Sequence, residues 1–155
     1  MTTFLGDYTC KLDDKGRVML PTAFKKSMPA DARDTFVVKK DIYSKCLVLY
    51  PLNEWEKQVE LLRLNLNPYN KEHNEFRRRF FKDTAEVILD ASNRLLLPRR
   101  LTDEVEITKE AIMAGQDGRI EIWSKDAYNA IDTGEDFASL AEKVMGGSLQ
   151  KPQWP

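Results

Sequence analysis

The amino-acid sequence predicts an α+β protein that is rich in β-strands and consists of two tandem copies of one half-domain. The first observation is a ten-residue motif that occurs twice. The second is that short apolar segments with strand character follow both copies of the motif in the same order. The third is a helical segment after the last strand of each copy. Repetition of this kind indicates that one structural unit was duplicated within the chain.

The repeated motif lies at residues 12–21 (LDDKGRVMLP) and 89–98 (LDASNRLLLP), which share Leu, Asp, Arg, Leu and Pro at equivalent positions. A second similarity joins residues 46–55 (CLVLYPLNEW) to 119–128 (RIEIWSKDAY). Two similarities in the same order are difficult to obtain by chance. The sequence therefore predicts homologous halves at about residues 7–66 and 84–145.

Each half is expected to begin with two strands joined by a tight turn, as in a β-hairpin, and to continue with two more strands. The predicted strands cover residues 7–13, 17–20, 35–39 and 47–50, and then 85–90, 94–97, 111–115 and 120–123. The first turn contains Gly16 and the second Asn93, both of which tolerate a positive φ. Pro21 and Pro98 follow the second strands and fit the first turn of a short helix.

Further helices are expected after the fourth strand of each half. Asn53 is predicted to cap the first of them, with Glu56 completing a capping box, and Ser124 to cap the second. The spacing of aromatic and basic residues over 67–82 predicts an amphipathic helix between the halves. Residues 146–155 are expected to form a flexible tail.

Composition excludes several classes of protein. The chain of 155 residues is 42% hydrophobic and 32% charged, with no apolar run of the 18 to 20 residues that span a membrane. The N-terminus lacks the basic and apolar regions of a secretory signal, so a cytoplasmic protein without a membrane partner is expected. Cys10 and Cys46 are too few for a disulfide framework or a zinc site, and both are expected to be small core residues.

No catalytic constellation or phosphate-binding loop occurs in the sequence, so we expect neither an enzyme nor a small-molecule substrate or cofactor. The single histidine, His73, has no second histidine or cysteine nearby, and no metal site is expected. The basic run at residues 77–79 could bind nucleic acid, form a solvated helix surface, or pair with another subunit.

The charge is unevenly distributed along the chain. Residues 1–102 contain 19 lysines and arginines against 14 acidic residues, a balance of +5. Residues 103–155 contain 5 against 11, a balance of −6. This asymmetry is compatible with one basic surface for an anionic partner and an acidic, solvating C-terminal segment.

The first turn carries the residues of greatest chemical interest. Asp13 and Arg17 flank it and can form a cross-strand ion pair, which contributes about 0.2–1 kcal/mol. The turn exposes Lys15 and Gly16 at its tip. A narrow β-ribbon fits the major groove of DNA, and the planar guanidinium of Arg17 can bind phosphate or guanine. The residues alone leave both a DNA contact and a purely structural hairpin open.

The doubled Asp-x-x-x-Arg motif, each copy followed by an apolar run that ends in Pro, resembles the MraZ family. Residues 47–55 (LVLYPLNEW) strengthen the resemblance, which extends over about residues 1–145. It implies tandem SpoVT-AbrB-like half-domains of the swapped-hairpin type, which form one pseudo-symmetric β-barrel-like unit with flanking helices. The expected divisions are repeat 1 at 7–53, a helical connector at 54–83, repeat 2 at 84–127, and a C-terminal helix and tail at 128–155.

The resemblance also implies a function. It indicates a nucleoid-associated transcriptional regulator, acting as a repressor of a division and cell-wall gene cluster. The implied partner is double-stranded promoter DNA with direct repeats, bound by a ring-shaped homo-oligomer.

The residue roles follow from the matching positions. Lys15 and Arg17 match the family's basic positions and are expected to contact DNA, whereas Asp13 and Asp90 are expected to maintain the hairpins together with Gly16. Arg94 is a further DNA-contact candidate. Its turn lacks the Lys-Gly tip, so contact with DNA and internal pairing with Asp90 both remain open.

Two other classes of protein compete with this interpretation. An antitoxin-like or transition-state regulator would use a related fold, but such proteins are generally single-copy and dimeric. An oligomeric scaffold would bind protein rather than DNA, and its assembly would not respond to changes at Lys15 and Arg17.

Overall fold

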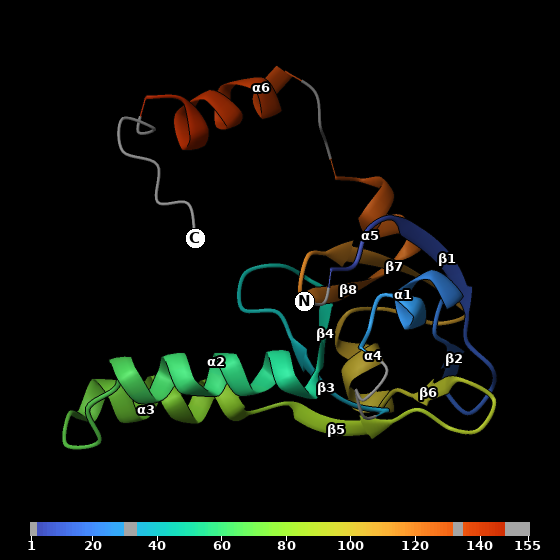
Figure 1. The fold of residues 1–155 in the computed structure, drawn as a ribbon, viewed down its shortest axis with the longest axis horizontal. Coiled ribbons are helices and arrows are strands. Elements are labelled where there is room, and N and C mark those ends of the chain that lie inside the picture. The colour runs from blue at the N-terminus through green and yellow to red at the C-terminus, as the bar shows by residue number, and fades with distance from the viewer. Residues whose placement is uncertain (1–2, 30–33, 132–134, 148–155) are drawn as a thin grey trace. The chain divides into compact units, whose positions relative to one another are not determined.

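The computed structural model describes residues 3–29, 34–131 and 135–147. The chain divides into two compact units, Met1–Lys125 and Asp126–Pro155. The first unit contains both copies of the repeated motif, so the two halves form one body rather than two separate domains. The fold is α+β and β-rich, as the sequence predicts (Figure 1).

The strands within the described residues are β1 Asp7–Lys11, β2 Arg17–Met19, β3 Thr35–Lys40, β4 Leu47–Pro51, β5 Thr84–Ile88, β6 Arg94–Leu96, β7 Glu110–Gln116 and β8 Arg119–Ser124. The helices of the first unit are α1 Thr22–Lys26, α2 Leu52–Asn65, α3 Lys71–Phe81 and α4 Arg99–Glu104. All eight predicted strands are present at nearly the predicted positions. None of the helices in the described residues is long and apolar enough to cross a bilayer.

Strand pairing exchanges partners between the two halves. Six strands form an antiparallel sheet in the order β1-β7-β8-β4-β3-β5, and β2 pairs with β6 in a separate ribbon. Thus β1 of the first half pairs with β7 of the second, and β5 of the second half pairs with β3 of the first. The tight turn between the first two strands of each half is present, but the main ladders of these strands run to the other half, as the swapped-hairpin type implies.

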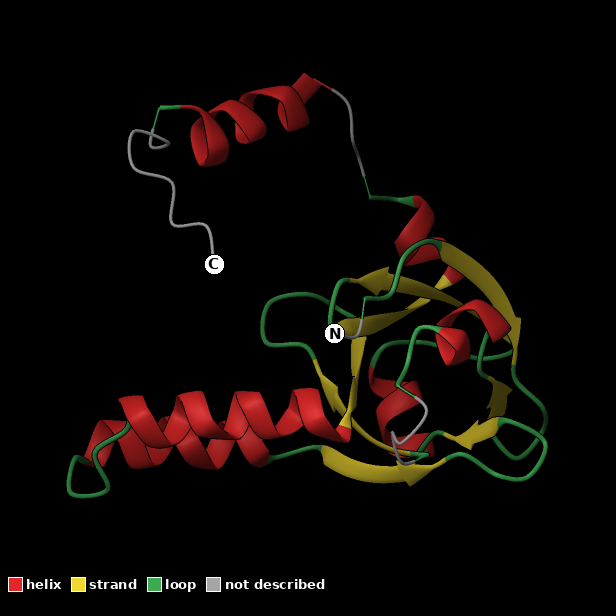
Figure 2. Ribbon diagram, in the orientation of Figure 1, coloured by secondary structure: helices red, strands yellow, loops and turns green. Residues whose placement is uncertain are grey.

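The ribbon of β2 and β6 connects the two edge strands of the sheet. An isolated bridge joins Leu12, just after β1, to Val18 of β2. On the other side, the N–H of Asp90, just after β5, donates to the carbonyl oxygen of Arg94 in β6 at 2.9 Å. The sheet and the ribbon together give the barrel-like arrangement in Figure 2.

The hydrophobic core lies between the sheet, the ribbon and the short helices. Val18 and Leu95 stand opposite each other at the centre of the ribbon and are fully buried. Phe24 of α1 and Leu101 of α4 are also fully buried, and Phe24 packs edge-on against Phe4 with ring centroids 5.4 Å apart. Burial of each such side chain contributes about 1.5–3 kcal/mol, so the shared core is the main stabilising element.

The helix starts differ from those expected. Pro21 and Pro98 occupy the N-cap positions of α1 and α4 rather than their first turns. The predicted cap at Asn53 is also wrong, because α2 begins at Leu52 directly after Pro51 and has no side-chain cap. Pro51 has no N–H to donate and a fixed φ, so the chain turns from β4 into the helix at that residue.

The amphipathic helix predicted between the halves is confirmed as α3, which lies against α2 in a helical hairpin (Figure 1). Asn70 caps α3, since its side chain accepts from the N–H of His73 at 3.0 Å. Trp55 of α2 stacks on Phe80 of α3 with ring centroids 5.8 Å apart, and contacts Tyr50 of β4 as well. These rings attach the helical hairpin to the sheet.

The C-terminal part begins with α5 Lys125–Asn129, which Ser124 immediately precedes. The second unit then contains α6 Glu135–Ala141 and a π-helical turn, Glu142–Gly146. Of the predicted flexible tail, residues 148–155 lie outside the described residues.

Both cysteines are buried, as predicted, and their thiols should be unreactive. Burial raises the pKa of Cys46 to about 12 and that of Cys10 above its ordinary value of 9.0. Reaction with a disulfide reagent requires the thiolate. At pH 8 the native protein should therefore react slowly with such a reagent, whereas the guanidinium-unfolded chain should release two equivalents of product at once. Rapid labelling of the native protein would contradict the buried placement.

Candidate nucleic-acid interface

The first Asp-x-x-x-Arg turn is organised by its aspartate. Asp13 Oδ1 accepts hydrogen bonds from the backbone N–H groups of Lys15 at 3.0 Å and Arg17 at 2.8 Å. Its Oδ2 accepts from the Nε of Arg17 at 2.7 Å. Gly16 closes the turn by donating its N–H to the Asp13 carbonyl oxygen at 3.0 Å, with φ at 86°. The carboxylate thus fixes the backbone of the turn and the arginine side chain together.

The second turn repeats this arrangement with different residues at its tip. Asp90 Oδ1 accepts from the N–H groups of Ser92 at 2.8 Å and Arg94 at 2.9 Å, and Oδ2 accepts from Arg94 Nε at 3.1 Å. Asn93 adopts a positive φ of 61°, as glycine does in the first turn. The two motifs are therefore equivalent in geometry as well as in sequence.

Electrostatics favours the ionised form of both aspartates. The backbone N–H of Arg17 lowers the pKa of the Asp13 carboxyl below its usual 3.8, and Arg94 lowers that of Asp90 in the same way. A carboxyl group whose pKa is lowered in the folded protein stabilises the fold at any pH above its ordinary pKa. This stabilisation is lost as the pH falls through the lowered pKa. We call the hydrogen bonds that each aspartate accepts from its turn and its arginine the aspartate clamp. Both clamps are intact at neutral pH.

The structure brings the two turns together, which the sequence did not indicate. Arg94 Nη1 lies 4.0 Å from Asp13 Oδ2, so the second arginine reaches the first aspartate. The Gly16 carbonyl oxygen accepts from the N–H of Leu97 at 3.1 Å, and Lys25 Nζ donates to Asn93 Oδ1. The pairing of β2 with β6 causes this proximity, because it places the start of each strand beside the end of the other.

Both arginines are held through Nε and are partly exposed, and Arg94 in addition reaches Asp13 with its Nη1. The side chains of Arg17 and Arg94 are 33% and 34% exposed. Within the described part of the chain, Arg17 uses only its Nε for a side-chain hydrogen bond. Its two terminal nitrogens remain available to a planar acceptor such as phosphate or the edge of guanine. Since the clamp fixes the guanidinium before binding, less conformational entropy is lost when a ligand binds.

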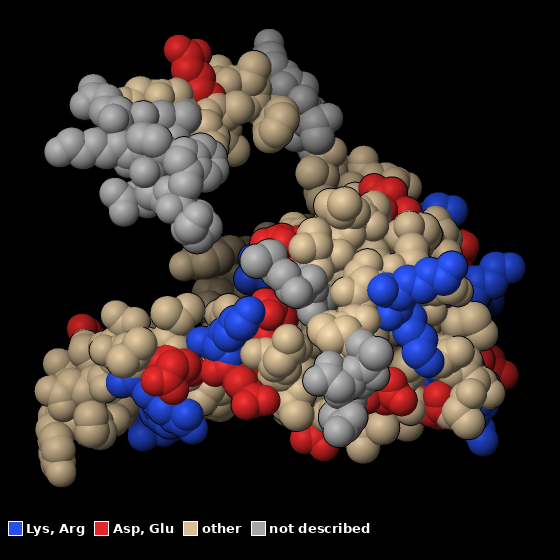
Figure 3. Space-filling model, viewed as in Figure 1, with Lys and Arg blue, Asp and Glu red and all other residues tan. Residues whose placement is uncertain are grey.

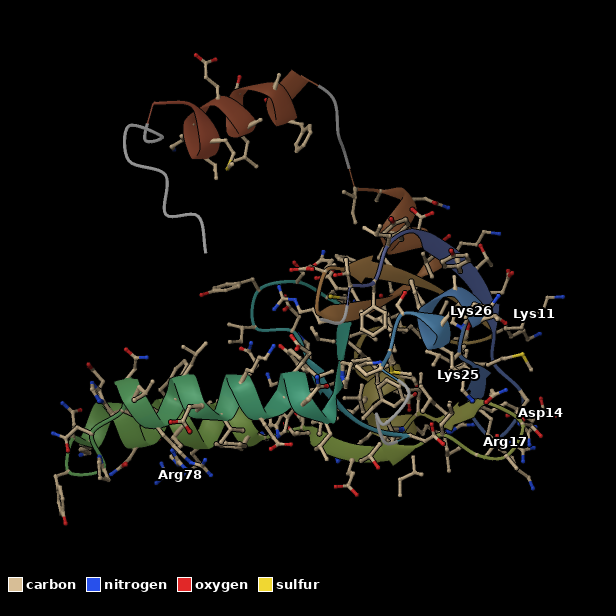
Figure 4. The ribbon with its side chains drawn as sticks, in the orientation of Figure 1. Lys11, Asp14, Arg17, Lys25, Lys26 and Arg78 are labelled. Carbon is tan, nitrogen blue, oxygen red and sulfur yellow. The ribbon has the colours of Figure 1, made fainter. Side chains whose placement is uncertain are left out.

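Further cations lie on the same side of the barrel. Figure 4 labels Lys11 at the end of β1, Lys25 and Lys26 on α1, and Arg17 on this side, and Figure 3 shows that blue side chains gather there. Lys15 is exposed at the tip of its turn. The lysines of α1 were not among the residues predicted from the sequence. The available signal was the Lys-Lys pair at residues 25–26, in the short helix expected after Pro21.

A hollow of about 280 Å³ adjoins the first turn but has mixed charge. Its charged lining residues are Asp13, Asp14, Asp103, Arg99 and Lys109. Arg99 also donates to the carbonyl oxygen of Asp14 at 3.4 Å. With three carboxylates against two cations, this hollow does not suit an anion.

The basic run at residues 77–79 lies apart from the turns. Arg78 and Arg79 form ion pairs with Glu75, at 2.8 and 2.9 Å, and Arg77 lies over the ring of Phe81. Figure 4 shows Arg78 on the helical hairpin, far from Arg17. The structure therefore does not combine this run with the Asp-x-x-x-Arg motifs.

His73 has a structural role, since its Nδ1 accepts the N–H of Asn67 at 2.9 Å. In the ranges that the structure describes, there is no group of three or more histidine, cysteine or acidic side chains arranged to bind a metal.

Comparison with known proteins identifies the family in which this doubled motif occurs. The chain matches the family described as "MraZ protein, putative antitoxin-like" over residues 3–79 and again over residues 80–144. The chain belongs to the MraZ family. A transcriptional regulator MraZ of Christiangramia forsetii is 42% identical over 149 residues, which cover 94% of this chain and 95% of that protein. The transcriptional regulator MraZ of Flavobacterium psychrophilum is 40% identical, with 94% of each chain covered. That of Bacteroides thetaiotaomicron is 34% identical, again over 94% of each. The family assignment and the tandem repeat are thereby confirmed.

Gly16 tests the geometry of the first turn. A side chain there would adopt an unfavourable φ of 86°, and its Cβ would lie 3.2 Å from the Leu97 carbonyl oxygen. We expect Gly16→Val to lower the free energy of unfolding by about 1–3 kcal/mol, measured by urea denaturation. Gly147→Val is the matched control, because among the described residues other than its chain neighbours no heavy atom lies within 4 Å of its added Cβ. An unchanged midpoint for Gly16→Val would show that the turn does not require this conformation.

Proposed function

We propose that this protein is a transcriptional regulator that binds double-stranded DNA sequence-specifically through the outer surface of the β2–β6 ribbon. The observation that carries the proposal is the pair of aspartate-clamped arginines on one two-stranded antiparallel ribbon, with exposed lysines around it. A ribbon of this width fits the major groove, where side chains can contact base edges. The names of the MraZ relatives, all transcriptional regulators, support the same function.

The residues of the turns take different roles in this proposal. Arg17 and Lys15 contact DNA directly, through a planar fork and a mobile ammonium respectively. Asp13 and Asp90 do not contact DNA; they hold the arginines and turns in position. Arg94 contributes a second, weaker contact, because its turn has Ser92 and Asn93 in place of a lysine and a glycine.

The proposed mode of action depends on several linked copies of the ribbon that bind DNA together. One ribbon makes few contacts, so tight binding needs several linked copies. We propose a ring-shaped homo-oligomer in the cytoplasm, associated with the nucleoid, whose subunits engage direct repeats in the promoter of a division and cell-wall gene cluster and repress it. Linked identical sites raise the overall affinity by about 10²–10⁴, provided that the geometry permits simultaneous contact. Head-to-tail contacts that close into a ring would supply this geometry.

Replacement of single basic residues tests the interface. Arg17→Ala and Lys15→Ala should abolish binding to the protein's own upstream DNA in a gel shift, because the loss is repeated in every engaged subunit. Arg94→Ala should weaken binding less. Arg63→Ala is the matched control, an arginine on α2 that is 65% exposed and paired with Glu60. Size-exclusion chromatography should give the wild-type elution volume for all four variants. Full binding by Arg17→Ala would reject the proposed interface, whereas an intact oligomer that never binds DNA would favour a protein scaffold.

Deletion of repeats and titration with salt test the multivalent mechanism. Removal of one direct repeat should reduce the affinity much more than in proportion to the number of repeats removed. A substitution that removes one phosphate-binding cation should reduce the slope of log K against log salt by about 0.9 per engaged subunit. Equal affinity for a single-repeat probe and the full operator would contradict the mechanism.

A further inference from the structure

The outer surface of the β2–β6 ribbon carries two apolar side chains that the fold leaves uncovered. Side chains alternate along each strand, so Val18 and Leu95 point into the core and are fully buried. Their neighbours Met19 and Leu96 point outward and are 58% and 55% exposed. Single exposed apolar side chains are common on protein surfaces, so it is the position of these two, beside the arginines, that makes them candidates for contact with a partner.

The register places these side chains directly beside the two arginines. Arg17 stands opposite Leu96, and Met19 stands opposite Arg94. Directly opposed residues lie about 4.5–5.5 Å apart, and alternate residues of one strand about 7 Å apart. Base pairs are stacked about 3.4 Å apart, so the four side chains together span about two base-pair steps.

The surrounding charge identifies the partner. The apolar pair lies beside two guanidinium groups, each paired with one carboxylate, and Figure 4 shows Lys11, Lys25 and Asp14 on the same side. A protein partner would need a matching acidic surface with an apolar centre. The major groove of DNA offers phosphates at its margins and one apolar group on its floor, the 5-methyl group of thymine.

We propose that Met19 and Leu96 determine part of the DNA specificity by contacting thymine 5-methyl groups, next to the base edges that Arg17 and Arg94 contact. This inference rests on the proposed function. A buried methyl group strengthens binding about fourfold, and the effect is repeated for each engaged subunit. Met19 and Leu96 thus add a preference for thymine to sites that the arginines select.

Replacement of thymine by uracil tests the proposal, since it removes only the 5-methyl group. The upstream DNA is amplified with dTTP or with dUTP, and both probes are titrated with the full-length protein at one salt concentration. Wild type should bind the uracil probe at least fourfold more weakly. The double variant Met19→Ala/Leu96→Ala should bind both probes equally, at about the affinity of wild type for the uracil probe. Leu64→Ala, an apolar residue of α2 that is 74% exposed, should behave as wild type.

The outcomes separate this inference from the function on which it rests. Equal binding of the two probes by wild type would overturn the thymine contact and leave DNA binding in place. A double variant that elutes as a smaller species and binds neither probe would overturn it in favour of a contact between subunits. If wild type binds neither probe above random DNA, the proposed function itself fails, and the thymine contact with it.

Discussion

The exchange of strand partners between the two halves is the constraint on which the rest of the structure depends. β1 and β5 each pair with a strand of the opposite half, and β2 pairs with β6 across the same division. A half of about 60 residues buries only about 60% of the surface that its unfolded chain exposes, so its stability alone would be marginal. Neither half can therefore complete its sheet or cover Val18 and Leu95 without the other. The fold therefore needs two copies of the half, and the duplication supplies both in one chain.

The turns follow from this exchange. After β1 and after β5 the chain must leave the large sheet and enter the ribbon within a few residues. Asp13 and Asp90 stabilise that passage by binding two backbone N–H groups each. The same carboxylates hold the arginines that face outward. Residues needed for the fold thus position the residues proposed for binding, so changes to the aspartates would affect both stability and function.

Much of the fold could be predicted because its signals are local. Short apolar runs located β3, β4, β7 and β8, and Gly16 and Asn93 located the turns with positive φ. The residues alone do not predict the pairing partners, since antiparallel pairing between residues from 45 to 107 positions apart leaves no local pattern; only the resemblance to a family implied a swapped arrangement. For the same reason, the sequence did not show that Arg94 approaches Asp13. The predicted cap at Asn53 was wrong because the helix already begins at Leu52, directly after Pro51.

The covalent link between the halves has a consequence for symmetry. Two copies of a single half would present identical turns about a twofold axis, and dimers of that kind match palindromic sites. Within one chain the turns can diverge, and they have: Lys15-Gly16 in one corresponds to Ser92-Asn93 in the other. The ribbon keeps the shape of a symmetric dimer but has distinguishable ends. If the ribbon binds a duplex as proposed, its two orientations there are not equivalent, and successive copies that share the preferred orientation match direct rather than inverted repeats.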